Sequence, residues 1–377
     1  MARHERLQLV VSGMVAGDSH QGGATWAVLQ YVLGLRRLGH DVMLVEPLDR
    51  APNADVSSYF REVTEAFDLR DRAALLVRGT RSTIGVSYDE LLRFAHNSDA
   101  VFNVAGMLTD DALLDPISTR LYLDLDPAFT QLWQAVEGID MRLDQHTHFA
   151  TVGSGIGRGS PVPTCGRDWV TTLPPVVLEH WPLADVIEHD ALTTVGNWRG
   201  YGSIHHEGVH YGQRAHSMRE LIDLPTQTDE RFELALDIHG DERCDLDALA
   251  ANGWTLLDPR SVARTPQAYA AFVRGSKAEL GVAKRGYVVS GSGWFSDRSA
   301  CYLASGRPVV AQDTGFAQVL PTGEGLFAFR DRDGALAAID DLRLDYHRHA
   351  RAAFEMAHAY FDSDRVLAEL LCRIGTC

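Results

Sequence analysis

A glycine-rich turn ahead of two helix-capping residues could bind an anion. Gly291 and Gly293 lack side chains and would let the backbone approach a ligand closely. Ser296 and Asp297 are residue types that begin helices. Because the first N–H groups of a helix are free and carry a partial positive charge, this turn suits a diphosphate. Arg298 could add a bidentate contact to a phosphate, or it could form only a surface ion pair.

A polar loop follows the next apolar run. Residues 307–311 (Arg-Pro-Val-Val-Ala) predict a buried strand, and the residues after it are Gln312, Asp313, Thr314 and Gly315. In α/β folds, ligands bind outside the carboxyl ends of the strands. We therefore expect this loop to contact phosphate or sugar beside the helix start.

These segments resemble the donor-sugar region of bacterial GT-B glycosyltransferases of the family 1/4-like kind. The resemblance rests on residues 293–298 (Gly-Trp-Phe-Ser-Asp-Arg), 303–310 (Leu-Ala-Ser-Gly-Arg-Pro-Val-Val) and 313–315 (Asp-Thr-Gly). In the N-terminal half, residues 22–24 (Gly-Gly-Ala) and 39–42 (Gly-His-Asp-Val) look like the pattern that opens these proteins. The resemblance covers most of the chain. It implies an α/β GT-B fold, in which two Rossmann-like doubly wound parallel-sheet domains face a central cleft.

The same resemblance implies a hexosyltransferase or related enzyme. It would move sugar from a nucleotide diphosphate donor to a hydroxyl or similar nucleophile on a small-molecule or glycan acceptor. No metal or cofactor is expected beyond the sugar nucleotide as co-substrate. Similar enzymes place basic residues against the donor phosphates, and Arg199, Arg214 and Lys284 are candidates, with a solvated surface cation as the alternative for each. Gly22 and Gly23 would belong to the acceptor-side loop.

One departure from the pattern concerns two carboxylates. Retaining members of the best-known GT-B subgroup carry two glutamates around the phosphate helix. Aligned on residues 306–308 (Gly-Arg-Pro), those positions are Gly293 and Cys301 in this chain. Neither the roles of these glutamates nor a stereochemical outcome can therefore be transferred.

Three residues compete for the role of catalytic base. His20 lies in the glycine-rich loop after the first predicted strand, where inverting GT-B enzymes often place a histidine. An unperturbed pKa of about 6.5 suits a base near neutral pH, although a loop histidine without a role is an equal alternative. Asp18 could orient His20 or act itself. Asp126 ends another strand together with Asp124, and capping before Pro127 is its alternative.

Composition limits the possible partners. A formal net charge of −16 argues against a nucleic-acid partner, because binding a polyanion requires a large cationic surface. Five cysteines without CxxC spacing suggest neither a disulfide framework nor zinc, and they favour a reducing, cytoplasmic compartment. The chain shows no signal peptide, and no apolar run approaches the roughly 20 residues of a membrane span. A group of histidines lacks metal-ligand spacing: His205, His206, His210 and His216.

Alternating strand and helix patterns position these candidates. The first series predicts strands at 7–13, 42–46, 100–104 and 120–124, and a helix at 24–38. The second predicts strands at 191–195, 232–238, 253–257, 278–282 and 308–311. We expect an N-terminal acceptor domain (1–178) and a C-terminal nucleotide-sugar domain (186–345). The helices of 346–377 are expected to return to the first domain.

Two alternative functions stay open. A non-catalytic nucleotide-sugar-binding protein would explain the missing glutamates as lost chemistry. An NAD-dependent oxidoreductase is disfavoured, because the first strand is followed by Gly13 and Gly17 rather than by Gly-x-Gly-x-x-Gly.

Overall fold

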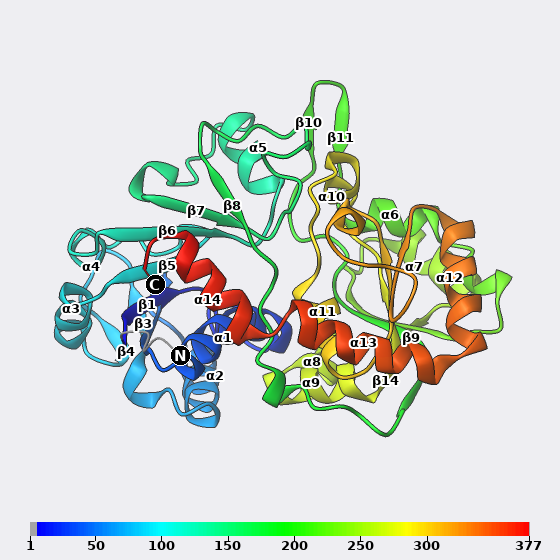
Figure 1. Ribbon diagram of the computed structural model, residues 1–377, viewed down its shortest axis with the longest axis horizontal. Helices are drawn as coiled ribbons and strands as arrows, with labels where there is room; N and C mark the ends of the chain where they lie inside the picture. The colour runs from blue at the N-terminus through cyan, green and yellow to red at the C-terminus, as the bar shows by residue number, and fades with distance from the viewer. Residues whose placement is uncertain (1–5, 377) are drawn as a thin grey trace.

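The computed structural model describes residues 6–376 and contains two large, mainly parallel β-sheets flanked by helices (Figure 1). A two-stranded hairpin, β10 (Ile204–His206) and β11 (Val209–Tyr211), lies between them at one end. Short 3-10 helices lie in the connections, among them η1 (Arg70–Arg72), η2 (Leu143–Gln145), η4 (Leu224–Gln227) and η5 (Phe316–Gln318).

The N-terminal sheet has the strand order β4-β3-β2-β1-β5-β6-β7-β8, and only the pairing of β4 with β3 is antiparallel. Its strands read as apolar runs because both faces are covered. They are β1 (Gln8–Ser12), β2 (Asp41–Leu48), β3 (Ala73–Val77), β4 (Thr83–Gly85), β5 (Ala100–Val104), β6 (Thr119–Asp124), β7 (His148–Thr151) and β8 (Trp169–Thr171). The helices are α1 (Gly22–Arg37), α2 (Ala54–Ala66), α3 (Tyr88–His96), α4 (Asp111–Leu114) and α5 (Phe129–Ala135).

The C-terminal sheet is parallel throughout, in the order β13-β12-β9-β14-β15-β16. Its strands are β9 (His189–Asn197), β12 (Phe232–Asp237), β13 (Thr255–Leu256), β14 (Ser276–Gly281), β15 (Val309–Gln312) and β16 (Leu326–Phe329). Its helices are α6 (Arg214–Glu220), α7 (Arg243–Ala251), α8 (Pro259–Ala263), α9 (Pro266–Gly275), α10 (Arg285–Ser290), α11 (Asp297–Ala304) and α12 (Arg332–Leu344).

Both sheets have the strand order of a doubly wound Rossmann-like unit. The order reverses between β1 and β5 in one sheet and between β9 and β14 in the other. Ligands bind at such reversal points, outside the carboxyl ends of the strands. The loops after β1, β9 and β14 are therefore the places where this fold offers a site.

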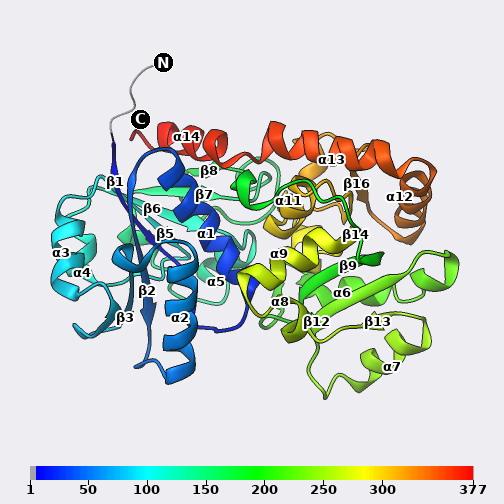
Figure 2. The ribbon, with the colours of Figure 1, turned by 90° about the horizontal axis from the view of Figure 1, so that it is seen from below.

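The chain crosses between the two halves twice. Residues 172–188 pass from one sheet to the other with only a short 3-10 helix, η3 (Leu178–His180). The return uses α13 (Tyr346–Tyr360), which packs on α11, and α14 (Ser363–Arg373), which packs on α1. Figure 2 shows these two helices following one another along one side of the molecule. Among residues 6–376, no helix is long and apolar enough to span a bilayer.

Candidate active site

A cavity of about 920 Å³ lies between the two halves. Its N-terminal side comes from the loop after β1, the start of α1 and the start of α2, and its C-terminal side from the loops after β9 and β14 and the start of α11. The polar lining includes Asp18, Ser19, His20, Gln21, Gln30, Asp55, Asn197, Tyr201, Gln213, Arg214, Asp237, Arg260, Arg264, Lys284, Ser296, Asp297 and Arg298. Both order-reversal points of the fold therefore face one cavity.

The start of α11 lines this cavity, but its polar groups are partly engaged. The N–H groups of Asp297 and Arg298 face the Asp297 carboxyl, and Ser296 makes no side-chain capping bond. Burial raises the pKa of Asp297, while Arg298 opposes that effect. The helix start is thus less available to a diphosphate than the sequence suggests, because a carboxyl of the chain already occupies its first N–H groups.

Arg298 is buried against its own domain. Its Nε donates to Glu279 Oε1 at 2.5 Å and its Nη1 to the Val195 carbonyl at 2.9 Å. Burial alone would lower the pKa of Arg298, but Glu279, Tyr269 and Tyr302 together outweigh burial and the pKa is raised. The side chain borders the cavity as a fixed positive charge, and its guanidinium is already paired.

Arg214 is the cation best placed to reach a ligand. Its Nε donates to the Val282 carbonyl at 2.9 Å and its Nη1 to the Asn197 carbonyl at 2.6 Å. Its Nη2 makes no hydrogen bond within residues 6–376. Burial, followed by the nearby Arg298, lowers the pKa of Arg214 to about 9. Two backbone carbonyls therefore hold a cation at the cavity and leave its Nη2 amino group for a ligand.

Arg199 lies apart from this group. It donates to Glu242 and is not among the residues that line the cavity. Its ion pair is partly exposed, with side-chain exposures of 34% and 23%. The expectation of a phosphate contact therefore fits Arg214 better than Arg199.

The loop after β15 also differs from expectation. Gln312 Oε1 accepts from the Ala283 N–H at 3.3 Å, and Thr314 Oγ1 donates to the Trp294 carbonyl at 2.5 Å. The Asp313 carboxylate accepts from the Gly315 N–H at 2.9 Å and pairs with Arg330. None of the four loop residues lines the cavity, because the loop folds onto neighbouring backbone of its own domain.

The glycines expected beside a ligand instead allow close contacts between protein segments. A Cβ at Gly22 would lie 2.2 Å from the Thr265 carbonyl oxygen, and one at Gly23 would lie 2.9 Å from the Tyr269 ring. A Cβ at Gly293 would lie 2.1 Å from Ser154 Oγ. Gly23 also lines the cavity, whereas Gly22 and Gly293 do not. Their lack of a side chain is explained by packing of one half of the protein on the other.

His20 has a partner on each side of the cleft. Its Nε2 lies 2.8 Å from Asp55 Oδ1, and Arg264 Nε donates to its Nδ1 at 3.2 Å. Since Nδ1 accepts, the proton is assigned to Nε2, which donates to Asp55. The hydrogen bond from His20 lowers the pKa of Asp55. We call His20, Asp55 and Arg264 the His20 cluster.

The backbone of His20 supports a functional interpretation. Its φ of 67° is positive, which a side-chain-bearing residue adopts at a cost of about 1–3 kcal/mol. Asp18 lines the same cavity, and its carboxylate accepts from Gln21. The loop therefore presents an imidazole and a carboxylate to the cleft, with Asp55 as the nearer partner of His20.

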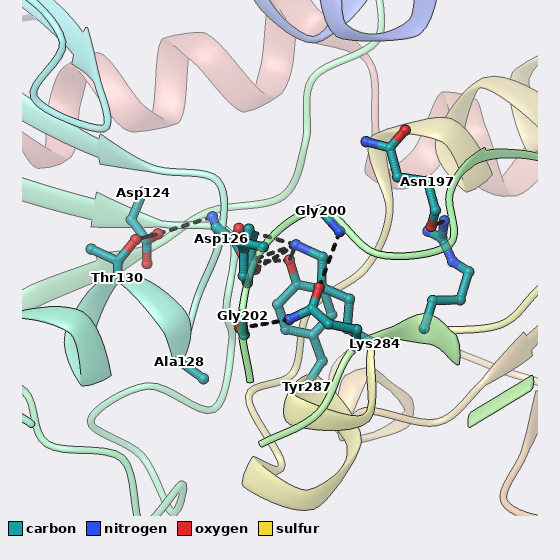
Figure 3. Close-up of polar contacts among 12 residues, drawn as sticks. Asp124, Asp126, Ala128, Thr130, Asn197, Gly200, Gly202, Lys284 and Tyr287 are labelled. Atoms are coloured by element: carbon teal, nitrogen blue, oxygen red, sulfur yellow. Dashed lines mark hydrogen bonds and ion pairs between the residues drawn. The ribbon is translucent and has the colours of Figure 1, made fainter. Parts of the chain in front are cut away.

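Asp126 is engaged by three side chains of the C-terminal half (Figure 3). Tyr201 OH donates to it at 2.6 Å, Tyr287 OH at 2.5 Å and Lys284 Nζ at 3.1 Å. We call these four residues the Asp126 cluster. Because three side chains already donate to its carboxylate, Asp126 is not free to deprotonate an acceptor in this arrangement, unlike the role considered from the sequence.

Comparison with solved structures supports the topology. No model of a known protein family and no curated protein matches the chain. An α-glucosyltransferase in complex with UDP-glucose and abasic-site DNA superposes with a TM-score of 0.60 at 13% identity, covering 98% of this chain and 99% of that one. HepE from Anabaena, in complex with UDP and glucose, superposes with a TM-score of 0.59 at 12% identity, covering 98% of this chain and 100% of that one. A glycosyltransferase from Rickettsia africae superposes with a TM-score of 0.55 at 11% identity, covering 98% of each chain.

The chain has the GT-B fold. The expectation of two Rossmann-like parallel-sheet units facing a central cleft is thereby confirmed. The residue limits expected for the domains stay a prediction.

Several residues of this GT-B cleft carry no signal in the sequence. Asp55 lies 35 positions from His20, and Arg264 lies 244 positions from it. Tyr201 and Tyr287 are 75 and 161 positions from Asp126. Only the folding of two sheets against each other brings these groups together, so spacing along the chain could not reveal them.

The histidines of the hairpin lie outside the cavity lining. His210 Nδ1 lies 2.7 Å from His205 Nε2, and the rings of His210 and His216 lie 4.9 Å apart. Among residues 6–376, no group of three or more His, Cys, Asp or Glu side chains has the arrangement of a metal site.

Proposed function

We propose that this protein is a glycosyltransferase that moves a sugar from a nucleoside diphosphate donor, bound in the GT-B cleft, to an acceptor hydroxyl. The observation that carries the proposal is the cavity itself. It has a cation with an unused N–H group, Arg214, on one side, and a histidine–carboxylate pair, His20 and Asp55, on the other. A UDP-sugar is the donor to test first, because two of the similar structures contain UDP or UDP-glucose.

Donor binding would use the C-terminal half. When the bond between the sugar anomeric carbon and the diphosphate breaks, its electron pair stays on the diphosphate. Fixed cations stabilise that developing charge in a site that excludes water. Arg214 supplies a direct contact, while Arg298 and Lys284 supply positive charge at the cavity surface. These groups support a reaction without a required metal.

Acceptor activation would use His20. The acceptor oxygen attacks the anomeric carbon while its proton passes to an imidazole nitrogen. Asp55 fixes the ring through Nε2, which leaves Nδ1 as the nitrogen to take the proton. Arg264 donates to Nδ1 in this structure, so acceptor binding must displace that bond. Since the Arg264–His20 contact is exposed, the rearrangement costs little.

We propose a small-molecule or glycan acceptor. One similar structure is a complex with DNA, but the net charge of −16 in this chain opposes binding of a polyanion. A cytoplasmic location, inferred from the cysteine content, belongs to the same proposal.

The test combines binding with turnover. Calorimetric titration with UDP is expected to show one site, and incubation with a UDP-sugar and a glycan panel is expected to release UDP with formation of a glycosylated product. Arg214→Ala is expected to weaken UDP binding by at least about tenfold, the effect of losing about 1.4 kcal/mol. Arg199→Ala is the matched control and should leave binding unchanged. Tight binding with no transfer to any acceptor would favour a non-catalytic binding protein, and binding of NAD alone would contradict the proposal.

A further inference from the structure

The carboxylate of Asp126 joins the two halves of the protein at one edge of the cleft. Asp126 follows β6 in the N-terminal half, whereas all three of its side-chain donors lie in the C-terminal half. Tyr201 OH also donates to the other carboxylate oxygen at 2.7 Å, and Lys284 Nζ donates to Tyr201 OH at 2.5 Å. The four groups form one connected network across the boundary (Figure 3).

The turn that carries Asp126 is held in a strained shape. Ala128 has a φ of 76°, in a region that favours glycine. The fully buried Asp124 carboxylate accepts from the Asp126 N–H at 3.0 Å, from Thr130 at 2.8 Å and from Gln131 at 2.9 Å. Because strain of this kind persists only where surrounding contacts impose it, Asp124 has a clear structural task. It fixes the turn that directs Asp126 across the cleft.

Aromatic rings partly shield the network from water. Lys284 Nζ lies 4.1 Å from the centre of the Tyr201 ring and 5.3 Å from that of Phe129. Trp133 packs on Tyr201 with ring centres 4.7 Å apart. Phe129 and Trp133 belong to the N-terminal half and Tyr201 to the C-terminal half, so both halves contribute to the shielding. A charged pair inside such a shell is screened much less than one in water.

A backbone contact beside the network shows how closely the halves approach. The Gly155 N–H donates to the Ser292 carbonyl at 2.9 Å, and a β-bridge pairs Gly153 with Trp294. A Cβ at Gly155 would lie 2.2 Å from the Gly291 carbonyl oxygen. Only glycine permits this approach, so the chain is built to close along this edge of the cleft.

We propose that Asp126 is a positioning residue that clamps the two domains together through Lys284, Tyr201 and Tyr287. The clamp sets the distance between the donor side of the cleft and the loop that carries His20. Because Lys284 also lines the cavity, the clamp fixes a positive charge at the cavity surface. For its effect on catalysis, the inference rests on the proposed transferase function.

Pulsed electron–electron double resonance tests the clamp without reference to activity. Spin labels are attached to Cys244 on α7 and Cys372 on α14, two exposed cysteines, after Cys165→Ser and Cys377→Ser substitutions. The unsubstituted clamp is expected to give one narrow distance distribution. Asp126→Asn is expected to broaden it or to add a longer distance. The matched control is Asp89→Asn, which removes an exposed carboxylate paired with Arg81 inside one domain.

Kinetics then separate positioning from structural support. Asp126→Asn is expected to lower kcat by about tenfold while the Kd for UDP changes by less than about twofold. Lys284→Met should lower kcat at least as much, because Lys284 also supplies positive charge at the cavity. The double variant should lose little more than Lys284→Met, since both changes break one contact. If a variant does not fold, Tyr201→Phe and Tyr287→Phe each remove one donor and should give smaller shifts in the distance distribution.

Two results would overturn the inference. One is a distance distribution for Asp126→Asn that matches that of Asp89→Asn. The other is full additivity of the Asp126 and Lys284 substitutions. A protein that binds no sugar nucleotide but shows the distance change would refute the proposed function and leave the clamp standing.

Discussion

Two groups of polar side chains cross the cleft, and they differ in their access to water. The His20 cluster is exposed at Asp55, whereas in the Asp126 cluster Lys284 and Asp126 are exposed by only 20% and 27%. The His20 cluster and the Asp126 cluster each combine a carboxylate from the N-terminal half with a cation from the C-terminal half. An exposed contact can exchange partners at little cost, while a shielded one resists breakage. The first therefore suits proton transfer, and the second suits holding the domains.

This difference shows that position at a strand end does not determine what a residue does. His20 and Asp126 both lie in loops that follow strands of the same sheet. Asp126 meets two phenols and an ammonium group among aromatic side chains, and all three groups donate to its carboxylate. His20 meets partners that solvent can replace. The side chains around His20 and Asp126 therefore determine the chemical role of each residue, and the other domain supplies those side chains.

Removing His20 should have the largest effect. His20→Ala is expected to lower the transfer rate by about 10²–10⁴-fold, the usual contribution of a general base, while UDP affinity stays unchanged. Steady-state rates and calorimetry measure the two quantities. His96→Ala, at an exposed position on α3, is the control. An unchanged transfer rate would show that His20 is not the catalytic base. The His20 cluster would then have no catalytic role to distinguish it from the Asp126 cluster.

Breaking the Asp126 cluster should instead reduce stability. Lys284→Met is expected to lower the free energy of unfolding by about 1–3 kcal/mol, because it leaves a partly buried carboxylate without its cation. Urea denaturation measures this change. Arg81→Met, which breaks an exposed pair, should cost under about 1 kcal/mol. Equal losses for the two variants would mean that shielding by the aromatic rings is unimportant.

The pH dependence of stability tests the coupling between Lys284 and Asp126 in the Asp126 cluster. Burial lowers the pKa of Lys284 and Asp126 opposes that effect, so Asp126→Asn should lower the pKa further. Between the folded pKa and the higher unfolded pKa, the unfolded chain binds more protons, and stability therefore rises with pH. The variant should show a steeper rise than the wild type from pH 7 to pH 10 in urea denaturation. Parallel curves would contradict the coupling of the two residues.

The smallest effect is expected at Asp55. The hydrogen bond from His20 lowers the pKa of this carboxylate, but the group is exposed to solvent. Asp55→Asn should leave the melting temperature unchanged and reduce transfer less than His20→Ala does, because only ring orientation is lost. Differential scanning calorimetry and initial rates measure both. A large loss of stability would show that the His20 cluster is structural.

The fold could be predicted from the sequence because its signals are local. Strands such as β5 and β15 are short apolar runs followed by loops, and the alternation with helices implies parallel sheets. Short strands such as β7 and β8, with polar or aromatic residues and an irregular segment between them, gave no such pattern. The hairpin of β10 and β11 was missed because three-residue strands lack a measurable period.

Site residues could be predicted from the sequence only where a single local segment of the chain contains the pattern that indicates them. His20, Arg214 and Ser296 line the cavity, since each follows a strand or lies at the start of a helix, and their roles stay predictions. The sequence misleads at Gly22 and Gly293. A residue without a side chain permits close approach of either a ligand or another segment of the protein, and the sequence does not distinguish the two. Contacts such as Asp126 with Tyr287 depend on domain packing, which no local pattern encodes.

The most direct test of the account is calorimetric titration of UDP, GDP, dTDP, ADP and NAD into the wild-type protein and Arg214→Ala. The account predicts that one nucleoside diphosphate binds the wild type at a single site and binds Arg214→Ala at least about tenfold more weakly. No binding of any diphosphate, or equal binding to both proteins, would contradict a donor site in this cleft.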